Sequence, residues 1–208
     1  KGVIQKLVSE EASRKDMEIA TRRRSVLGTN QYPNITEYLN SDFNFPATSR
    51  KNDSEFEPLV MYRGAEKLEE LRFITDKFAE SNKRPVAWMF TYGNLAMRKA
   101  RSQFAGNFFG CAGYEIIDNP GFSSAEEGIA SAKQDKPDIV IICSSDVEYN
   151  DIAEPIFNAL KNDAVVVLAG YPKEMIEKLN EIGLTNLIHV KSNLLEELKR
   201  YNELLNIV

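Results

Sequence analysis

The chain of 208 residues is poor in the side chains that most often bind metals or form disulfides: it has one histidine, His189, and two cysteines, Cys111 and Cys143. Two cysteines so far apart in sequence do not make a disulfide framework, which favours a reducing, cytoplasmic compartment. With a single histidine, the sequence gives little support for a metal site. Because His189 lies in the apolar stretch "NLIHV", we predict a partly buried structural role for it.

Long apolar runs and signal-peptide features are also missing. No stretch approaches the ~20 apolar residues that are needed to span a bilayer. The net charge is −5, from 26 basic and 31 acidic residues, which argues against a general nucleic-acid binder. Apolar residues still make up 43% of the chain, which is enough for a substantial core. We therefore expect a folded protein that associates with neither membrane nor nucleic acid.

From about residue 84 onward, short apolar runs alternate with helical patterns. Strands are predicted over 85–90, 114–118, 138–146, 164–170 and 186–190. Helices are predicted from near Asn94, and over 123–135, 147–161, 172–183 and 193–205. This alternation is typical of parallel βαβ units with right-handed crossovers, and near-continuous apolar strands fit a sheet covered on both faces. The predicted fold class is α/β, a flavodoxin-like five-stranded parallel sheet in the order 2-1-3-4-5.

The first 83 residues have a different pattern. A helix is predicted over 2–24, a short strand over 25–30 and a further helix over about 59–80. Residues 40–58 are polar and rich in turn-forming residues, which indicates a linker or a wrapping segment. These elements cannot form a core alone. We therefore expect them to pack on the C-terminal domain or on other chain.

Ligands of open α/β sheets bind beyond the carboxyl ends of the strands, at the point where the strand order reverses. In the order 2-1-3-4-5, the loops at that point are Thr91–Asn94 and Cys143–Asp146, which are rich in hydroxyl, amide or glycine groups. One interpretation is a pocket for a polar ligand, because helix N-termini offer free N–H groups and partial positive charge. The other is that Asn94, Ser144 and Ser145 cap helices and form turns, as these residue types often do.

Other chemistries of this fold lack their key residues here. A phosphoacceptor domain needs an acidic pair after the first strand, which is absent, and Asp146 comes too late after the third. An FMN site favours a hydroxyl-rich loop after the first strand, where only Thr91 partly serves. Cys143 has no second histidine to activate it as a nucleophile, which favours a core role. Basic side chains that could bind anions, or could belong to solvated helix faces, are Arg22, Arg23, Arg24, Arg98, Lys99 and Arg101.

Several stretches together resemble the methylmalonyl-CoA mutase family. "IATRRRSVLGTNQYPN" (19–34) is similar to the end of its substrate barrel, and "YRGAEKLEELR" (62–72) to the segment that follows. "VAWMFTYGNLAMRKARSQFAGNFFGCAGYEIID" (86–118) and "IVIICSSDVEYNDIAEPIFNAL" (139–160) resemble its C-terminal cobalamin-binding-type domain. The similarity is closest to the small (beta) subunit of the heterodimeric enzyme.

This resemblance implies a domain organisation. A full subunit would have a long barrel before Lys1, so we expect the chain to correspond to its C-terminal portion. Residues 1–40 would be the remnant of a TIM-barrel C-terminus, 41–83 a linker and helical segment, and 84–208 the cobalamin-binding-like domain.

The large subunit of that family carries an Asp-x-His-x-x-Gly motif after the first strand, and its histidine binds the cobalt of the cofactor. The resemblance places Tyr92 at the aspartate, Asn94 at the histidine and Met97 at the second glycine. A phenol and an amide cannot replace an imidazole and the carboxylate that orients it. Together with Trp88 and Phe90, Tyr92 and Met97 are expected to crowd the channel for the nucleotide tail of the cofactor.

The resemblance therefore implies a non-catalytic small subunit of adenosylcobalamin-dependent methylmalonyl-CoA mutase, which interconverts methylmalonyl-CoA and succinyl-CoA. We expect no catalytic residue, no metal and no cofactor in this chain, with adenosylcobalamin held by its partner, the large (alpha) subunit. The residues of the candidate vestigial pocket are Tyr92, Gly93, Asn94, Ser144 and Ser145. The alternative is a ligand-binding module that takes a nucleotide, a CoA fragment or a corrinoid in this switch-point pocket.

Overall fold

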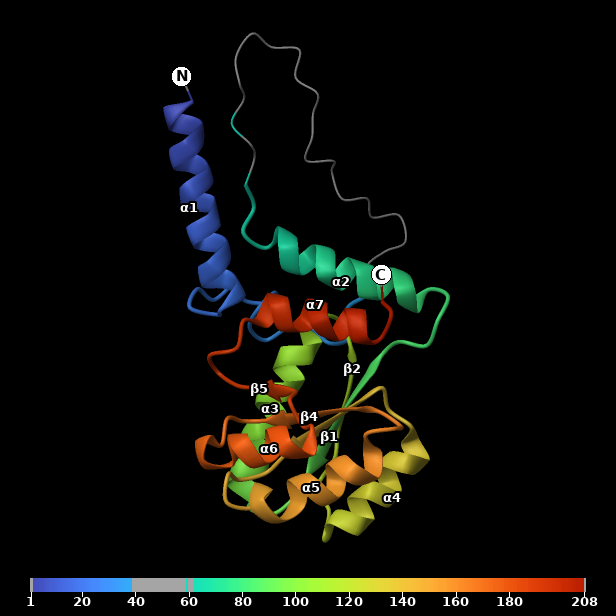
Figure 1. The fold of residues 1–208 in the computed structure, drawn as a ribbon. Helices are drawn as coiled ribbons and strands as arrows, with labels where there is room; N and C mark the ends of the chain where they lie inside the picture. Colours follow the sequence, from blue (N-terminus) through green and yellow to red (C-terminus); the bar gives the residue numbers. More distant parts are fainter. Residues whose placement is uncertain (1, 39–58, 60–61, 208) are drawn as a thin grey trace.

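A computed structural model describes residues 2–38, 59 and 62–207 of the chain. Its centre is a five-stranded parallel sheet in the order β2-β1-β3-β4-β5, which confirms the predicted α/β, flavodoxin-like topology (Figure 1). The strands are β1 (Val86–Thr91), β2 (Glu115–Asp118), β3 (Ile139–Cys143), β4 (Val165–Ala169) and β5 (Leu187–Ile188). The helices after them are α3 (Leu95–Gly110), α4 (Ala125–Asp135), α5 (Tyr149–Leu160), α6 (Ile176–Ile182, after a 3-10 turn at Lys173–Met175) and α7 (Leu194–Leu204).

Helices cover both faces of the sheet, because successive side chains of a strand point to opposite sides. On β1, Ala87 and Met89 pack against α3 and α7, in the first of two apolar clusters. Trp88 and Phe90 point the other way, into a cluster closed by α4, α5 and α6. The sequence left the direction of these two aromatic side chains open, and the structure assigns both to the second cluster. Strands β1 and β3 are consequently buried on both sides, as their apolar composition predicted.

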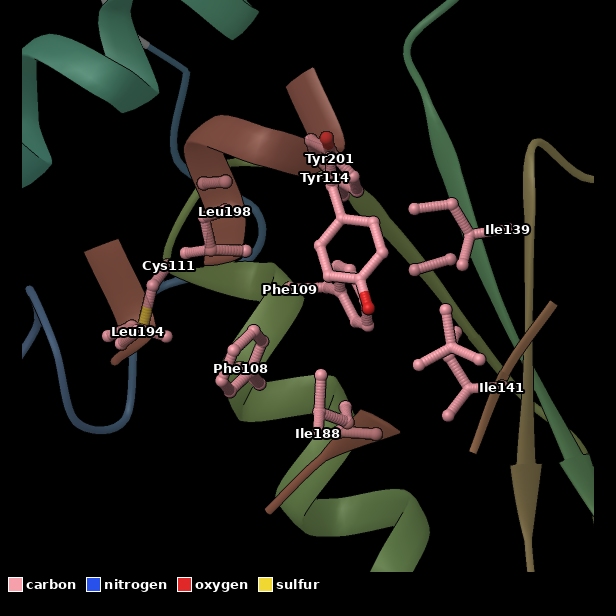
Figure 2. Close-up of a cluster of buried hydrophobic side chains, with 14 of the residues drawn as sticks. Phe108, Phe109, Cys111, Tyr114, Ile139, Ile141, Ile188, Leu194, Leu198 and Tyr201 are labelled. Carbon is pink, nitrogen blue, oxygen red and sulfur yellow. The ribbon is translucent and has the colours of Figure 1, made fainter. Parts of the chain in front are cut away.

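The first cluster is built around aromatic rings from α3, from α7 and from Tyr114, the residue directly before β2 (Figure 2). Phe109 lies edge-on to Tyr201, with ring centroids 5.1 Å apart, and stacks on Tyr114 at 5.7 Å. The Tyr114 hydroxyl donates to the Asn202 side-chain oxygen at 2.7 Å. The Asn202 amide in turn donates to Thr75 Oγ1 at 3.3 Å. This chain of hydrogen bonds connects the sheet, α7 and the preceding helix that carries Thr75.

That preceding helix is α2 (Glu66–Ala79), which lies on the outer side of α7 (Figure 1). It buries Leu68 and Leu71 in the first cluster. The first helix, α1 (Val3–Ala20), extends away from the domain and buries only Ile19 and Ala20 at its end. The expectation that the N-terminal elements pack on the C-terminal domain is thus confirmed for α2 and for the end of α1.

The short strand predicted over 25–30 is wrong: the segment forms turns, with one isolated bridge between Leu27 and Gln31. The physical reason is the buried side chain of Asn30. Its oxygen accepts from the Val26 N–H at 2.8 Å, and its amide donates to the carbonyls of Ile19 and Arg24, both at 2.8 Å. The Val26 N–H is thereby occupied within the segment, where a strand would pair it with a neighbouring strand, and the turn is held against the end of α1.

Other boundaries also shift. The helix predicted from residue 59 begins at Glu66, and the whole of the linker predicted over 40–58 lies outside the described residues. Strand β5 ends at Ile188, so His189 follows the strand instead of lying inside it. None of the helices described here is both long and apolar enough to cross a membrane.

Candidate functional site

The loops after β1 and β3 lie side by side at the carboxyl edge of the sheet. The two strands are paired up to Thr91 and Cys143, their last residues. The Tyr92 N–H then donates to the Cys143 carbonyl at 3.2 Å, which carries the pairing into the loops. The structure therefore brings the predicted pocket residues of both loops together at the point where the strand order reverses.

In the β1 loop, Asn94 is the N-cap of α3: its side-chain oxygen accepts from the Met97 N–H at 3.1 Å. The capping interpretation of Asn94 is thereby confirmed. Met97 lies on the first turn of this helix and is 38% exposed, and the expectation that it crowds the channel for a nucleotide tail stays a prediction. Tyr92 is half-buried, and its ring packs against the second apolar cluster, to which Phe90 belongs.

In the β3 loop, the two serines turn their hydroxyls toward the β1 loop and toward the start of α5. Ser144 Oγ lies 2.8 Å from the Tyr92 carbonyl oxygen and 2.5 Å from Oε2 of Glu148. Ser145 Oγ donates to the same carboxylate oxygen at 2.7 Å, and the Ser145 N–H does so at 3.1 Å. Ser145 Oγ also accepts from the Glu148 N–H at 3.3 Å, so it caps the turn that leads into α5, whose own N-cap is Glu148. Ser144 has no such cap bond, and the two serines share one carboxylate.

That carboxylate belongs to Glu148, which the sequence reasoning did not single out. Its other oxygen, Oε1, accepts from the Asn94 N–H of the β1 loop at 2.8 Å. Burial raises the pKa of Glu148, but the hydrogen bonds from Ser144, Ser145 and the Asn94 N–H outweigh burial and lower it to about 2. A signal was present in the sequence, since Ser145 and Glu148 have the S-x-x-E spacing of a capping box.

The basic residues near this edge are engaged with the chain itself. Arg98 donates to the carbonyls of Gly93 at 3.1 Å and Pro120 at 3.2 Å. Arg101 forms an ion pair of 2.9 Å with Asp146. Between the ends of β1 and β2 lies a cavity of about 200 Å³. The residues that line it are Thr91, Leu95, Arg98, Lys99, Ser102, Asp118, Asn119 and Pro120.

Two further residues that the sequence analysis considered, Cys143 and Arg22, have contacts that indicate a structural role. Cys143 is fully buried at the end of β3, and burial raises the pKa of its thiol, as a core role predicts. Arg22 lies over the rings of Phe104 and Phe108, 4.8 and 5.3 Å from their centroids, and donates to the His189 carbonyl. It fastens the end of α1 to the edge of the domain.

The donor set at this edge does not fit cobalt ligation. The only histidine of the chain, His189, follows β5, and β3 and β4 separate that strand from β1. Its Nδ1 accepts from the Lys191 N–H at 3.2 Å, and burial lowers its pKa. At the position where the resemblance calls for an imidazole, the amide of Asn94 is committed to its helix cap. Within the described residues, no three His, Cys, Asp or Glu side chains gather in a way that could hold a metal ion.

No protein-family model matches the chain. Among curated proteins, a methylmalonyl-CoA mutase small subunit of Porphyromonas gingivalis is 46% identical over 202 residues, which is 96% of this chain and 32% of the relative. A probable methylmalonyl-CoA mutase small subunit of Mycobacterium tuberculosis is 30% identical over 199 residues, 92% of this chain and 30% of the relative. A methylmalonyl-CoA mutase small subunit of Streptomyces virginiae is 31% identical over 156 residues, 74% of this chain and 24% of the relative.

The chain thus spans about a third or less of the length of the curated relatives that it matches. The match to the first of these relatives runs through both the N-terminal helices and the α/β domain, since it includes nearly every residue of this chain. By its sequence, the chain is a homologue of the methylmalonyl-CoA mutase small subunits and matches their C-terminal portion.

Proposed function

We propose that this chain is the C-terminal portion of a small subunit of adenosylcobalamin-dependent methylmalonyl-CoA mutase, a cytoplasmic enzyme. In this role it carries no catalytic residue and supports assembly with the large subunit, which holds the cofactor. The names of the relatives and the 46% identity of one of them support the identification as a small subunit.

The observation that carries the non-catalytic role is that Asn94 stands at the position of the cobalt-binding histidine and that its side chain caps α3. Cobalt ligation from the protein needs an imidazole with a free nitrogen, oriented by a second polar group. Asn94 has an amide instead, and its oxygen already accepts a hydrogen bond within α3. Tyr92, at the position of the orienting carboxylate, packs its ring against the second cluster. Asn94 and Tyr92 therefore support the proposal that the domain has the fold of a corrinoid binder but lacks the side chains that would bind cobalt.

Assembly is tested by co-expressing the chain with the large subunit of a methylmalonyl-CoA mutase and following both by size-exclusion chromatography. The two chains are expected to elute together, and the large subunit is expected to be more soluble and more active with the chain than without it. A large subunit that is fully soluble and active alone, and that elutes apart from the chain, would contradict the assembly role.

Cofactor binding is tested on the chain alone with hydroxocobalamin, using His189→Ala as the matched control. We expect no red band to elute with either protein. An absorption spectrum of histidine-ligated cobalt in the chain, lost in His189→Ala, would contradict the proposal. Corrinoid binding that His189→Ala leaves unchanged would instead favour the alternative, a ligand-binding module at the switch-point pocket.

A further inference from the structure

The side chain of Glu148 lies between the β1 and β3 loops and is bonded to both of them. Its two carboxylate oxygens accept from four donors: the hydroxyls of Ser144 and Ser145, the Ser145 N–H and the Asn94 N–H. The distances run from 2.5 Å for the Ser144 hydroxyl to 3.1 Å for the Ser145 N–H. Backbone N–H groups and small hydroxyls at helix starts are the donors that α/β folds commonly present to a bound anion.

A helix cap explains only part of this arrangement. Ser145 and Glu148 form the reciprocal pair of a capping box, in which the Glu148 N–H donates to Ser145 Oγ at 3.3 Å and the carboxylate accepts from the Ser145 N–H. The Asn94 N–H is not part of such a box, because it comes from a different loop, 54 residues away in sequence. The carboxylate therefore joins the starts of α3 and α5.

Gly93 provides the space that brings the carboxylate against the β1 loop. A Cβ at this position would lie 2.1 Å from Glu148 Oε1 and 2.3 Å from Cδ, well inside van der Waals contact. Gly93 also has a positive φ of 73°, which disfavours other residues. The backbone of the β1 loop thus lies directly against the carboxylate, where any side chain would force the two apart.

From these contacts we infer that Glu148 is an internal anion that closes the crevice between β1 and β3, and that it takes up the donors that the two loops would otherwise offer to an anionic ligand. This inference deepens the proposed function, because it identifies what closes the corrinoid-type crevice. Removal of the carboxylate then leaves a small site that a free carboxylate of matching size can fill.

The inference is tested by the variant Glu148→Ala and its rescue with formate, the smallest carboxylate. Thermal unfolding is followed in an excess of sodium formate and in sodium chloride of the same ionic strength. In chloride, Glu148→Ala is expected to melt about 2–8 °C below the wild type. Formate is expected to recover a large part of this loss, because a ligand that binds only the folded state raises its melting temperature.

Glu154→Ala is the matched control, because Glu154 lies on α5 as well and its ion pair with Lys178, at 3.7 Å, is exposed. Neither it nor the wild type is expected to gain from formate over chloride. The inference is overturned if Glu148→Ala melts within about 1 °C of the wild type, or if formate stabilises it no more than Glu154→Ala.

Glu148→Gln keeps the test decisive if the alanine variant does not fold. Its amide fills the same space without the charge, so the variant is expected to melt between Glu148→Ala and the wild type, with no gain from formate. A Glu148→Gln protein as stable as the wild type overturns the inference. These outcomes do not depend on co-elution with a large subunit, so failure of the inference and failure of the proposed function are separate results.

Discussion

The two helices that precede the sheet, α1 and α2, differ in how they are held. Both have apolar residues at helical spacing. In α2, Leu68 and Leu71 are buried against the domain, 2% and 4% exposed. In α1, Ile4 and Leu7 remain 65% and 60% exposed, and only the last two residues are buried. The comparison teaches that an apolar stripe shows which face of a helix can be covered, whereas the neighbouring elements decide whether it is.

The polar contacts of the two helices differ in the same way as their apolar contacts. α2 is joined to the domain by the Thr75–Asn202 hydrogen bond and by the ion pair between Asp76 and Arg84, at 2.6 Å and largely buried. The ion pairs of α1 are exposed and mostly internal, such as Arg14 with Glu11 at 2.7 Å. Exposed pairs contribute about 0–1 kcal/mol to stability, so α1 gains little from them.

The largest expected effect comes from truncating the buried stripe of α2. Leu71→Ala should lower the free energy of unfolding by about 2–5 kcal/mol, because it removes buried methyl groups and leaves a cavity. Leu7→Ala on α1 is the matched control and should change the free energy by less than about 0.5 kcal/mol. Urea unfolding followed by circular dichroism measures both. Equal losses of stability in Leu71→Ala and Leu7→Ala would contradict the difference between the two helices.

The next effect concerns the buried hydrogen bond between Tyr114 and Asn202, which leads on to Thr75 of α2. Asn202→Ala leaves the buried Tyr114 hydroxyl without its acceptor and should cost about 1–3 kcal/mol. Tyr114→Phe removes the other partner. Because the unpaired hydroxyl is the main cost, the double variant should be more stable than the sum of the single losses predicts. Strict additivity in urea unfolding would contradict this role for the hydrogen bond.

Sequence patterns predicted the sheet and its helices because near-continuous apolar strands and the helices between them are local features. Asn94 could also be interpreted as a cap, since its acceptor role lies within its own helix. For Glu148, the spacing to Ser145 could have predicted the local part of its contacts, whereas the bond from the Asn94 N–H could not be predicted, because that loop meets Glu148 only in the fold. The turn at 25–30 was missed for a similar reason: Asn30 bonds to Ile19, 11 residues before it.

A further comparison is between the hydrogen bonds of Glu148, at the carboxyl ends of the strands, and the bond between Tyr114 and Asn202. The first involve a charged carboxylate, whereas the second joins two neutral side chains. The folded state lowers the pKa of Glu148 from 4.5 to about 2, so the unfolded chain binds the proton more readily between these values. The stability from Glu148 is therefore full above about pH 4.5 and is lost as the pH falls toward 2.

The variant Glu148→Gln tests this pH dependence of the stability. At pH 7 it should be less stable than the wild type by about 1–2 kcal/mol, through the loss of charge-assisted hydrogen bonds at a half-exposed site. The gap should narrow below about pH 4.5, whereas the Asn202→Ala gap should stay constant over the same range. Urea unfolding at a series of pH values measures both. A Glu148→Gln gap that is independent of pH would contradict the charged tie.

The smallest expected effect concerns an ion pair between the two helices, Asp16 of α1 with Lys67 of α2, at 2.6 Å. The Lys67 side chain is 56% exposed, so solvent screens the pair, and Asp16→Asn should cost about 0.2–1 kcal/mol at low salt. The loss should shrink further at about 1 M salt, where charges are screened within ~3 Å. Urea unfolding at both salt concentrations measures it. A loss above about 2 kcal/mol that persists in high salt would show that α1 is anchored along its length, because only a desolvated pair escapes screening.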